Sequence, residues 1–256
     1  MSDELLISER HERVTLLRLN RPERANALTE PLLDALTVRL AEVAADPQID
    51  AAVITGAGRA FCAGGDLTTL TAWQALSARE RRARYRKGAA LALGVAELGI
   101  PVVAAVNGAA AGAGLDLALC ADLCLAARSA SFVSGFVAVG LVPDLGGSWL
   151  LPRVVGLSRA RRLVLGGERL DAETACEWGI AARVVDDDCL IDEAVATATG
   201  IAAQGCRPAY AEAKRALLDS TWSFAESLEQ AATTQSLLMD TPEHRQRSRT
   251  ILARTR

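Results

Sequence analysis

A single carboxylate, Asp144, stands in an otherwise apolar and glycine-rich run between Val139 and Trp149. Earlier in the chain, a turn of small residues from Asn107 to Gly114 opens an expected helix. A carboxylate in apolar surroundings can accept a proton and return it, and a turn with almost no side chains can offer backbone N–H groups to an oxyanion. Together the two features predict carbanion or enolate chemistry.

A second glycine-rich loop, Gly56–Asp66, also follows a buried apolar run. Neither loop has the spacing of a nucleotide-binding motif, because Phe61 and Leu117 stand where the last glycine of a dinucleotide fingerprint is needed. Residues with little side chain directly after a strand let a ligand approach the main chain, and a helix N-terminus adds partial positive charge. Two N–H groups from these loops, converging on one oxygen, would form an oxyanion hole for a thioester enolate.

The elements that must position these loops are predicted from apolar runs and helical periodicity. Four runs read as buried strands, at 14–19, 51–55, 102–106 and 122–126, and a fifth strand is expected near 182–186. Helices are expected at 29–45, at 79–98, and from the small-residue turn to about Cys120, with three more in the C-terminal part of the chain. Strands that alternate with helices predict an α/β fold with a parallel sheet.

Composition excludes several classes of function. The net charge of −3 gives no general attraction to nucleic acid or to an anionic membrane. No apolar run approaches the ~20 residues that span a bilayer, and the acidic N-terminus lacks a secretion pattern, so a cytoplasmic protein is expected. The only histidines, His11 and His244, lie near the termini and disfavour a histidine-based triad or metal centre. The six cysteines form no C-x-x-C pair and are expected to be reduced thiols, with no metal site.

Several motifs resemble the signatures of one family, the crotonase (enoyl-CoA hydratase/isomerase) superfamily. They are Phe61–Leu67, Ala104–Gly108, Gly112–Gly114, Gly140–Arg153 and Glu177–Gly179, and the resemblance covers nearly the whole chain. It implies a crotonase-like spiral of ββα units over residues 1–200 and a C-terminal helical trimerisation region over 201–256. It also implies a homotrimer or hexamer and an acyl-CoA substrate. No cofactor is implied, since coenzyme A is part of the substrate.

The resemblance also implies the site residues. The two oxyanion donors fall on the backbone N–H groups of Gly65 and Ala113, and Asp116 and Asp144 are the candidate catalytic carboxylates. The expected substrate contacts are Arg24, Ala25, Ala27, Ala63, Gly64, Asp66, Leu67, Gly112, Phe136 and Trp149.

Departures from the hydratase pattern favour an isomerase. Hydratases of this family carry glutamates where Asp116 and Phe136 stand, so the pair of carboxylates that positions water is incomplete. An aspartate at the position of Asp144 resembles enoyl- and dienoyl-CoA isomerases and those acting on ring epoxides of phenylacetyl-CoA, and the run 107–156 is most similar to the last type. These patterns predict double-bond or ring-epoxide isomerisation with Asp144 as the proton shuttle.

The residues themselves agree with this mechanism. Apolar neighbours of Asp144 in the sequence are expected to desolvate its carboxylate and raise its pKa above the usual ~3.9. These neighbours are Phe136, Val139, Leu141 and Trp149.

Other interpretations stay open from the residues alone. Asp144 could simply cap a helix that begins at Gly146. Asp116 could fix its loop or bind water rather than act in catalysis. At the level of function, the alternatives are a hydratase that uses Asp116 and Asp144 to activate water, and a non-catalytic acyl-CoA binding protein.

Overall fold

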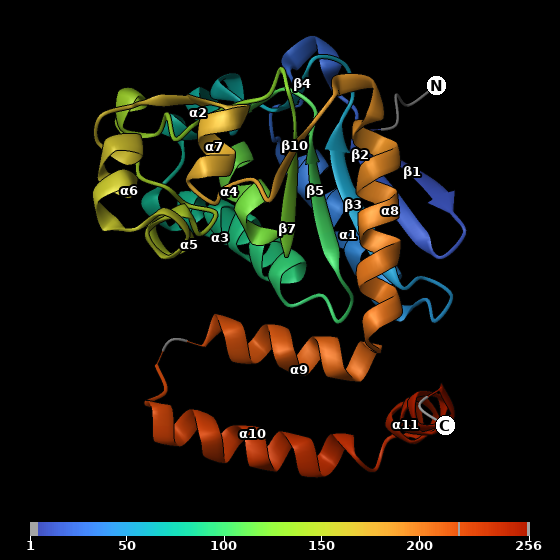
Figure 1. Ribbon diagram of the computed structural model, residues 1–256. Helices are drawn as coiled ribbons and strands as arrows, with labels where there is room; N and C mark the ends of the chain where they lie inside the picture. The colour runs from blue at the N-terminus through green and yellow to red at the C-terminus, as the bar shows by residue number, and fades with distance from the viewer. Residues whose placement is uncertain (1–4, 220, 255–256) are drawn as a thin grey trace.

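The computed structural model describes residues 5–219 and 221–254. It places two mixed β-sheets side by side and surrounds them with helices (Figure 1). The six-stranded sheet has the order β1-β2-β3-β5-β7-β10, and the four-stranded sheet has the order β4-β6-β8-β9. The strands are β1 (Leu6–His11), β2 (Val14–Leu19), β3 (Ala51–Gly56), β4 (Ala60–Cys62), β5 (Val102–Val106), β6 (Ala109–Ala111), β7 (Leu123–Ala127), β8 (Ser131–Val133), β9 (Arg169–Asp171) and β10 (Arg183–Val185).

The chain repeats one unit of two strands and a following helix. In the pairs β3–β4, β5–β6 and β7–β8, the first strand joins the six-stranded sheet in parallel and the second joins the four-stranded sheet. A helix then returns the chain to the start of the next pair. This arrangement confirms the predicted spiral of ββα units.

The helices pack around the sheets as far as Gln204, and the later helices extend beyond the sheets. They are α1 (Glu30–Ala45), α2 (Leu67–Ala72), α3 (Ala78–Ala96), α4 (Ala113–Cys120), α5 (Gly147–Val155), α6 (Leu157–Val164), α7 (Ala172–Glu177), α8 (Leu190–Gln204), α9 (Arg207–Leu218), α10 (Phe224–Leu238) and α11 (Pro242–Arg254), with short 3-10 turns η1 (Pro22–Arg24), η2 (Trp73–Ala75), η3 (Val137–Val139) and η4 (Asp187–Cys189). The long helix α8 lies across the face of the six-stranded sheet, and α1 packs beside α3 (Figure 1).

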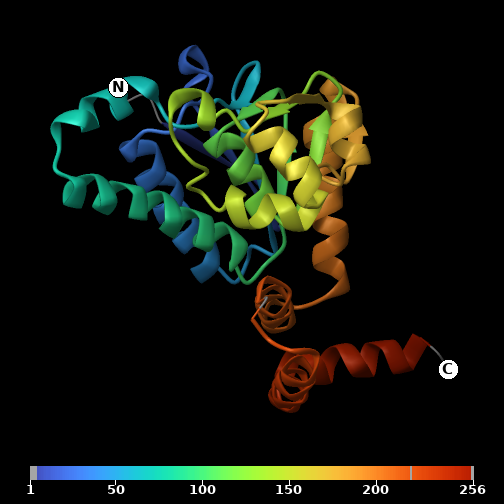
Figure 2. The ribbon, with the colours of Figure 1, turned by 90° about the vertical axis from the view of Figure 1, so that its left-hand side faces the viewer.

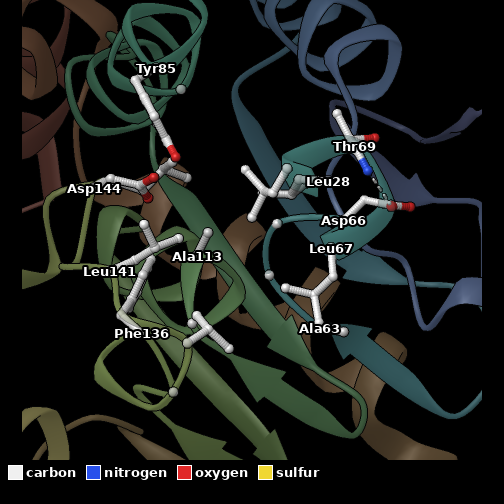
Figure 3. A pocket seen from close by; sticks show the side chains of 18 of the residues that line it. Leu28, Ala63, Asp66, Leu67, Thr69, Tyr85, Ala113, Phe136, Leu141 and Asp144 are labelled. Carbon is white, nitrogen blue, oxygen red and sulfur yellow. Dashed lines mark hydrogen bonds between the residues drawn. The ribbon is translucent and has the colours of Figure 1, made fainter. Parts of the chain in front are cut away.

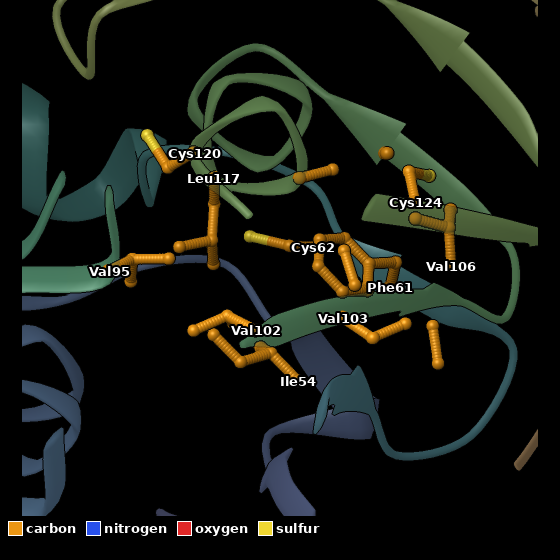
Figure 4. Packing of buried hydrophobic residues seen from close by; sticks show 14 of the residues in the cluster. Ile54, Phe61, Cys62, Val95, Val102, Val103, Val106, Leu117, Cys120 and Cys124 are labelled. Carbon is orange, nitrogen blue, oxygen red and sulfur yellow. The ribbon is translucent and has the colours of Figure 1, made fainter. Parts of the chain in front are cut away.

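The hydrophobic core fills the space between the two sheets and α4. Phe61 and Cys62 of β4 are fully buried and lie between Val103 of β5 and Leu117 of α4 (Figure 4). Because both faces of these strands are covered, their sequences are continuously apolar rather than alternating. The core therefore fixes the strand ends from which the glycine-rich loops begin.

Helices α9 to α11 extend below this core, and α10 and α11 lie farthest from the sheets (Figure 2). Two basic side chains tie α9 to the rest. The Lys214 ammonium, almost fully buried, donates to Oδ2 of Asp122 at 2.8 Å and to the Ile100 carbonyl at 3.2 Å. Arg207 donates to backbone carbonyls at the end of α1, including that of Ala44 at 2.8 Å.

Large apolar side chains on α9 and α10 remain exposed, among them Leu217, Phe224 and Leu237. The predicted boundary between residues 200 and 201 falls inside α8, which still packs on the sheet. A separate oligomerisation region stays a prediction. Within the described ranges, none of the helices has both the length and the apolar character needed to cross a membrane.

Candidate active site

A mostly apolar cavity of about 190 Å³ lies between the two glycine-rich loops, α3 and the segment before α5 (Figure 3). Its walls come from five parts of the chain that are far apart in sequence. The lining residues are Leu28, Glu30, Leu33, Ala63, Gly64, Gly65, Asp66, Leu67, Thr69, Leu70, Trp73, Arg84, Tyr85, Gly88, Ala111, Gly112, Ala113, Gly135, Phe136, Val139, Leu141, Asp144 and Leu145.

The two glycine-rich loops meet because the strands before them pair in parallel. Strands β4 and β6 lie side by side, with Ala60 opposite Ala109. The carboxyl ends of parallel strands face the same edge of a sheet, where ligands of α/β proteins commonly bind. The loop after β4 and the turn after β6 therefore leave the sheet at the same edge.

Gly65 forms a parallel β-bridge with Leu28, and this bridge directs the Gly65 N–H away from the segment that contains Leu28. In this bridge the Leu28 N–H donates to the Gly64 carbonyl at 2.7 Å, and the Asp66 N–H donates to the Leu28 carbonyl at 3.0 Å. The bridge uses the polar groups on either side of Gly65, so the N–H of Gly65 itself points to the opposite side. Gly65 is one of the residues that line the cavity.

The N–H of Ala113 is free for a different reason. Ala113 is the first residue of α4, and the first N–H groups of a helix have no acceptor within the helix. The preceding Gly112, with φ of 52°, turns the chain from β6 into α4 and donates its own N–H to the Val133 carbonyl. The partial positive charge of the helix N-terminus adds to the field at this donor.

Gly64 brings the two donors together. A Cβ at this position would lie 2.7 Å from the Ala111 carbonyl oxygen and 3.1 Å from the Ala113 nitrogen. Its φ of 91° also favours glycine. The close approach means that the N–H groups of Gly65 and Ala113 border the same end of the cavity. Two N–H groups at one end of an apolar cavity suit a developing oxyanion, and the assignment of Gly65 and Ala113 as its donors stays a prediction.

Asp144 presents its carboxylate to the cavity from the segment before α5 (Figure 3). Phe136 and Leu141 lie beside it in the figure, and its Oδ1 is buried with no hydrogen-bond partner among the described residues. Burial raises the pKa of Asp144 above the ordinary value of 3.8. The residue is not the N-cap of α5, which begins at Gly147 with Gly146 as its cap. A carboxylate with one unpaired oxygen in apolar surroundings can act as a base.

Asp116 lies behind the cavity wall rather than in it. The residue is only 2% exposed, and its Oδ2 accepts a hydrogen bond from the Leu145 N–H at 3.3 Å. Burial raises the pKa of Asp116 to about 7, although the N–H groups of Gly147 and Leu145 oppose the shift and the charge of Asp144 adds to it. Of the two carboxylates that the sequence singled out, only Asp144 faces the cavity.

Asp66, which also lines the cavity, is fixed by hydrogen bonds and an ion pair. Its Oδ1 accepts from the N–H groups of Thr68 and Thr69 at the start of α2, and its Oδ2 pairs with Arg21 at 3.1 Å. Burial alone would raise the pKa of Asp66, but these hydrogen bonds and the guanidinium hold it below 3.8. Arg21 also donates to the Ala27 carbonyl at 2.5 Å, so it links the Gly64–Asp66 loop to the strand-like segment beside it.

The predicted contacts fall into two groups. Ala63, Gly64, Asp66, Leu67, Gly112 and Phe136 line the cavity together with the proposed donors. Arg24, Ala25 and Ala27 lie outside its wall, although Leu28 of the same segment is part of it.

Trp149 also lies outside the cavity, because its ring stacks on the guanidinium of Arg153, 3.6 Å from the ring centroid. The expected desolvation of Asp144 by Trp149 is therefore not found. Helix α5 begins after Asp144 and directs the indole toward a groove beside Lys214.

One wall of the cavity is formed by side chains that were not among the predicted contacts. Trp73, Arg84, Tyr85 and Gly88, from η2 and α3, complete the site around Asp144. A Cβ on Gly88 would lie 2.8 Å from Cδ1 of Leu145, so this glycine lets the Asp144 segment pack closely on α3. Tyr85, the single aromatic residue on the arginine-rich helix α3, was the available signal.

Comparison with known proteins agrees with this geometry. Residues 9–254 match the family model for enoyl-CoA hydratase/isomerase. The chain is 44% identical over 202 residues to the 1,2-epoxyphenylacetyl-CoA isomerase of Escherichia coli (strain K12), covering 78% of this chain and 77% of the relative. It is 34% identical over 206 residues to the crotonyl-CoA hydratase of Syntrophomonas wolfei, covering 80% and 78%.

Solved structures show the same fold. The crystal structure of an enoyl-CoA hydratase from Polaromonas sp. JS666 superposes with a TM-score of 0.91 and 30% sequence identity, over 97% of both chains. The chain belongs to the enoyl-CoA hydratase/isomerase (crotonase) family, whose enzymes act on acyl-CoA thioesters. The names of its relatives divide between isomerases and hydratases.

Proposed function

We propose that this protein is an acyl-CoA isomerase in which Asp144 carries a proton from one carbon of the acyl group to another. The observation that carries the proposal is the difference between its two candidate carboxylates. Asp144 faces the cavity with an unpaired oxygen, whereas Asp116 is bound to backbone N–H groups behind the wall. One carboxylate in an apolar site fits proton transfer between carbons.

The proposed reaction begins with the thioester carbonyl oxygen between the N–H groups of Gly65 and Ala113. Asp144 removes a proton from the acyl chain, the C–H electron pair moves into the conjugated system, and negative charge collects on the thioester oxygen. The same carboxyl group then returns the proton to a different carbon, which shifts the double bond and regenerates the base. Each oxyanion donor of this kind is typically worth ~2.7–4 kcal/mol of barrier.

The remaining wall disfavours addition of water. Hydration needs a water molecule that is positioned as well as activated, and a pair of carboxylates commonly does this in the family. Phe136 occupies the position of the second carboxylate and is 7% exposed, beside Leu141 in the cavity wall. An apolar side chain there cannot orient water by a hydrogen bond.

The acyl group is proposed from similarity as well as geometry. The E. coli relative is named for a ring-epoxide substrate, and its 44% identity supports a substrate of that kind or a simple enoyl thioester. In both cases the chemistry is an isomerisation with no net gain or loss of atoms. The hydratase names among other relatives make hydration the rival activity.

Separate incubation with a 3-enoyl-CoA and a 2-enoyl-CoA distinguishes these activities. We expect conversion of the 3-enoyl thioester to the conjugated 2-enoyl isomer, and loss of that conversion in Asp144→Ala. Rapid hydration of the 2-enoyl thioester that survives Asp144→Ala would overturn the proposal in favour of a hydratase. Tight binding of both thioesters without any conversion would instead indicate a non-catalytic binding protein.

A further inference from the structure

The polar groups of the cavity are distributed unevenly. On one wall Asp66 is bound by Arg21, and at the α1 edge Glu30 pairs with Arg84 at 2.7 Å. On the other wall, Asp144 and Tyr85 lie near each other, and Figure 3 shows the phenol oxygen of Tyr85 directed toward the Asp144 carboxylate.

Tyr85 is held in this orientation by its neighbours. Its ring packs edge-to-face against Trp73, with centroids 5.4 Å apart and planes at 90°. Arg84 in turn lies over Trp73, 5.9 Å from the ring centroid. Both aromatic residues line the cavity, so the contact with Trp73 supports the Tyr85 ring while its hydroxyl lies beside the Asp144 carboxylate (Figure 3). A donor held in place loses little entropy when it forms a hydrogen bond.

The phenol stays protonated in this environment. Burial first, and the charge of Asp144 second, raise the pKa of Tyr85 above 10.0 despite the opposing effect of Arg81. At neutral pH the hydroxyl is therefore a hydrogen-bond donor. An acyl group that fills the cavity removes water from this donor, and a buried donor left unpaired costs ~1–3 kcal/mol.

We propose that Tyr85 determines specificity by donating a hydrogen bond to an oxygen substituent on the acyl group, so that acyl-CoA thioesters bearing a hydroxyl, ether or epoxide oxygen are preferred over pure hydrocarbon chains. This inference rests on the proposed isomerisation, because it assigns Tyr85 a role beside the carboxylate that moves the proton. A hydrocarbon chain offers the Tyr85 hydroxyl no hydrogen-bond acceptor, and both remaining arrangements are unfavourable. The hydroxyl stays unpaired, or it donates to the nearby Asp144 carboxylate and weakens the base.

The test compares the kcat/KM values for 3-hexenoyl-CoA and for the same thioester carrying a hydroxyl on C5 or C6. In Tyr85→Phe we expect kcat/KM to fall for the oxygen-bearing substrate and to rise for the hydrocarbon. The ratio of the two should drop at least fivefold, since ~1 kcal/mol corresponds to a factor of about five. A ratio that changes less than fivefold would overturn the proposal.

The sequence offers a matched control. Tyr210 is the other of the two tyrosines, and its hydroxyl donates to the Ile201 carbonyl far from the cavity. Tyr210→Phe removes the same atom and should leave the substrate ratio of the wild-type protein unchanged.

A direct readout is available in the same variant. With Tyr210→Phe as the background, 3-fluorotyrosine labels Tyr85 alone, and its ¹⁹F resonance should shift differently on binding the oxygen-bearing and hydrocarbon thioesters. Identical shifts would contradict the hydrogen bond.

Failure of the Tyr85 proposal would leave isomerisation of 3-hexenoyl-CoA by the wild-type protein intact, whereas failure of the proposed function would abolish that conversion as well.

Discussion

The carboxylate of Asp116 occupies the space that a side chain on Gly147 would need. A Cβ on Gly147 would lie 2.0 Å from Oδ1 of Asp116, and the N–H of Leu145 donates to Oδ2 of the same carboxylate. The backbone of Leu145 and Gly147, which follow Asp144, therefore packs against the Asp116 carboxylate on the side away from the cavity. The buried Asp116 positions the segment of Asp144, which lines the cavity, so the two carboxylates have different tasks.

Gly147→Ala tests this contact. The added methyl group must displace Asp116 or the start of α5, and overpacking of this kind costs about 1–3 kcal/mol of unfolding free energy. Since a displacement of about 1 Å can cost 100-fold in rate, we expect kcat/KM for isomerisation to fall by a factor on that order. Denaturant titration and steady-state kinetics measure the two effects.

Gly94→Ala in α3 is the control, because a Cβ there meets only Cδ1 of Leu40 at an ordinary 3.9 Å. It should retain wild-type activity. If Gly147→Ala were equally active, the contact with Asp116 would not set the position of Asp144.

Asp116 should also make stability depend on pH in an uncommon direction. Its pKa is raised from 3.8 to about 7 in the folded protein. Between these values the folded state binds the proton more tightly than the unfolded state, so the unfolding free energy falls as pH rises from about 4 to about 7. Above pH 7 the contribution is lost and the dependence ends.

Asp116→Asn removes this titration. We expect the unfolding free energy of the variant, relative to wild type, to increase between pH 4 and pH 8 by up to about 4 kcal/mol, the equivalent of the pKa shift. Urea titrations of both proteins across this range provide the measurement. Parallel curves for variant and wild type would show that Asp116 is charged at neutral pH in the folded protein.

Ala113→Pro tests the helical oxyanion donor without removing a side-chain contact. Proline is tolerated at the first position of a helix, where its missing N–H is not needed for helix formation. We expect kcat to fall about 10²–10³-fold, as for the loss of one oxyanion donor. Ala78→Pro changes the first residue of α3, which is exposed, and should have little effect on kcat. Equal activity of both variants would exclude the Ala113 N–H from the reaction.

The two loops at the site could be predicted from the sequence because they depend on local features. Small residues directly after buried strands identified the loops of Gly65 and Ala113, and parallel pairing of β4 with β6 brings them together. Strands β4 and β6 themselves were not expected, since three-residue strands such as Ala60–Cys62 give no alternating pattern. Their place in the four-stranded sheet depends on long-range pairing.

The side chains that line the cavity were harder to predict than the loops. Trp149 follows Asp144 closely in sequence but is turned away by α5, whereas Tyr85 is distant in sequence and faces the same cavity. The helix around Tyr85 is rich in arginine, and one of its sides reaches the site through packing that includes Gly88 against Leu145. Such contacts follow from tertiary packing rather than from periodicity.

Solvent deuterium exchange tests the central role of Asp144 most directly. In D₂O, with a 3-enoyl-CoA as substrate, mass spectrometry should detect deuterium at the carbons that lose and gain the proton. The rate of this exchange should fall by a factor of about 10²–10⁴ in Asp144→Asn, the usual contribution of a general base. Exchange at the wild-type rate in a folded Asp144→Asn variant would contradict the assignment of Asp144 as the proton shuttle.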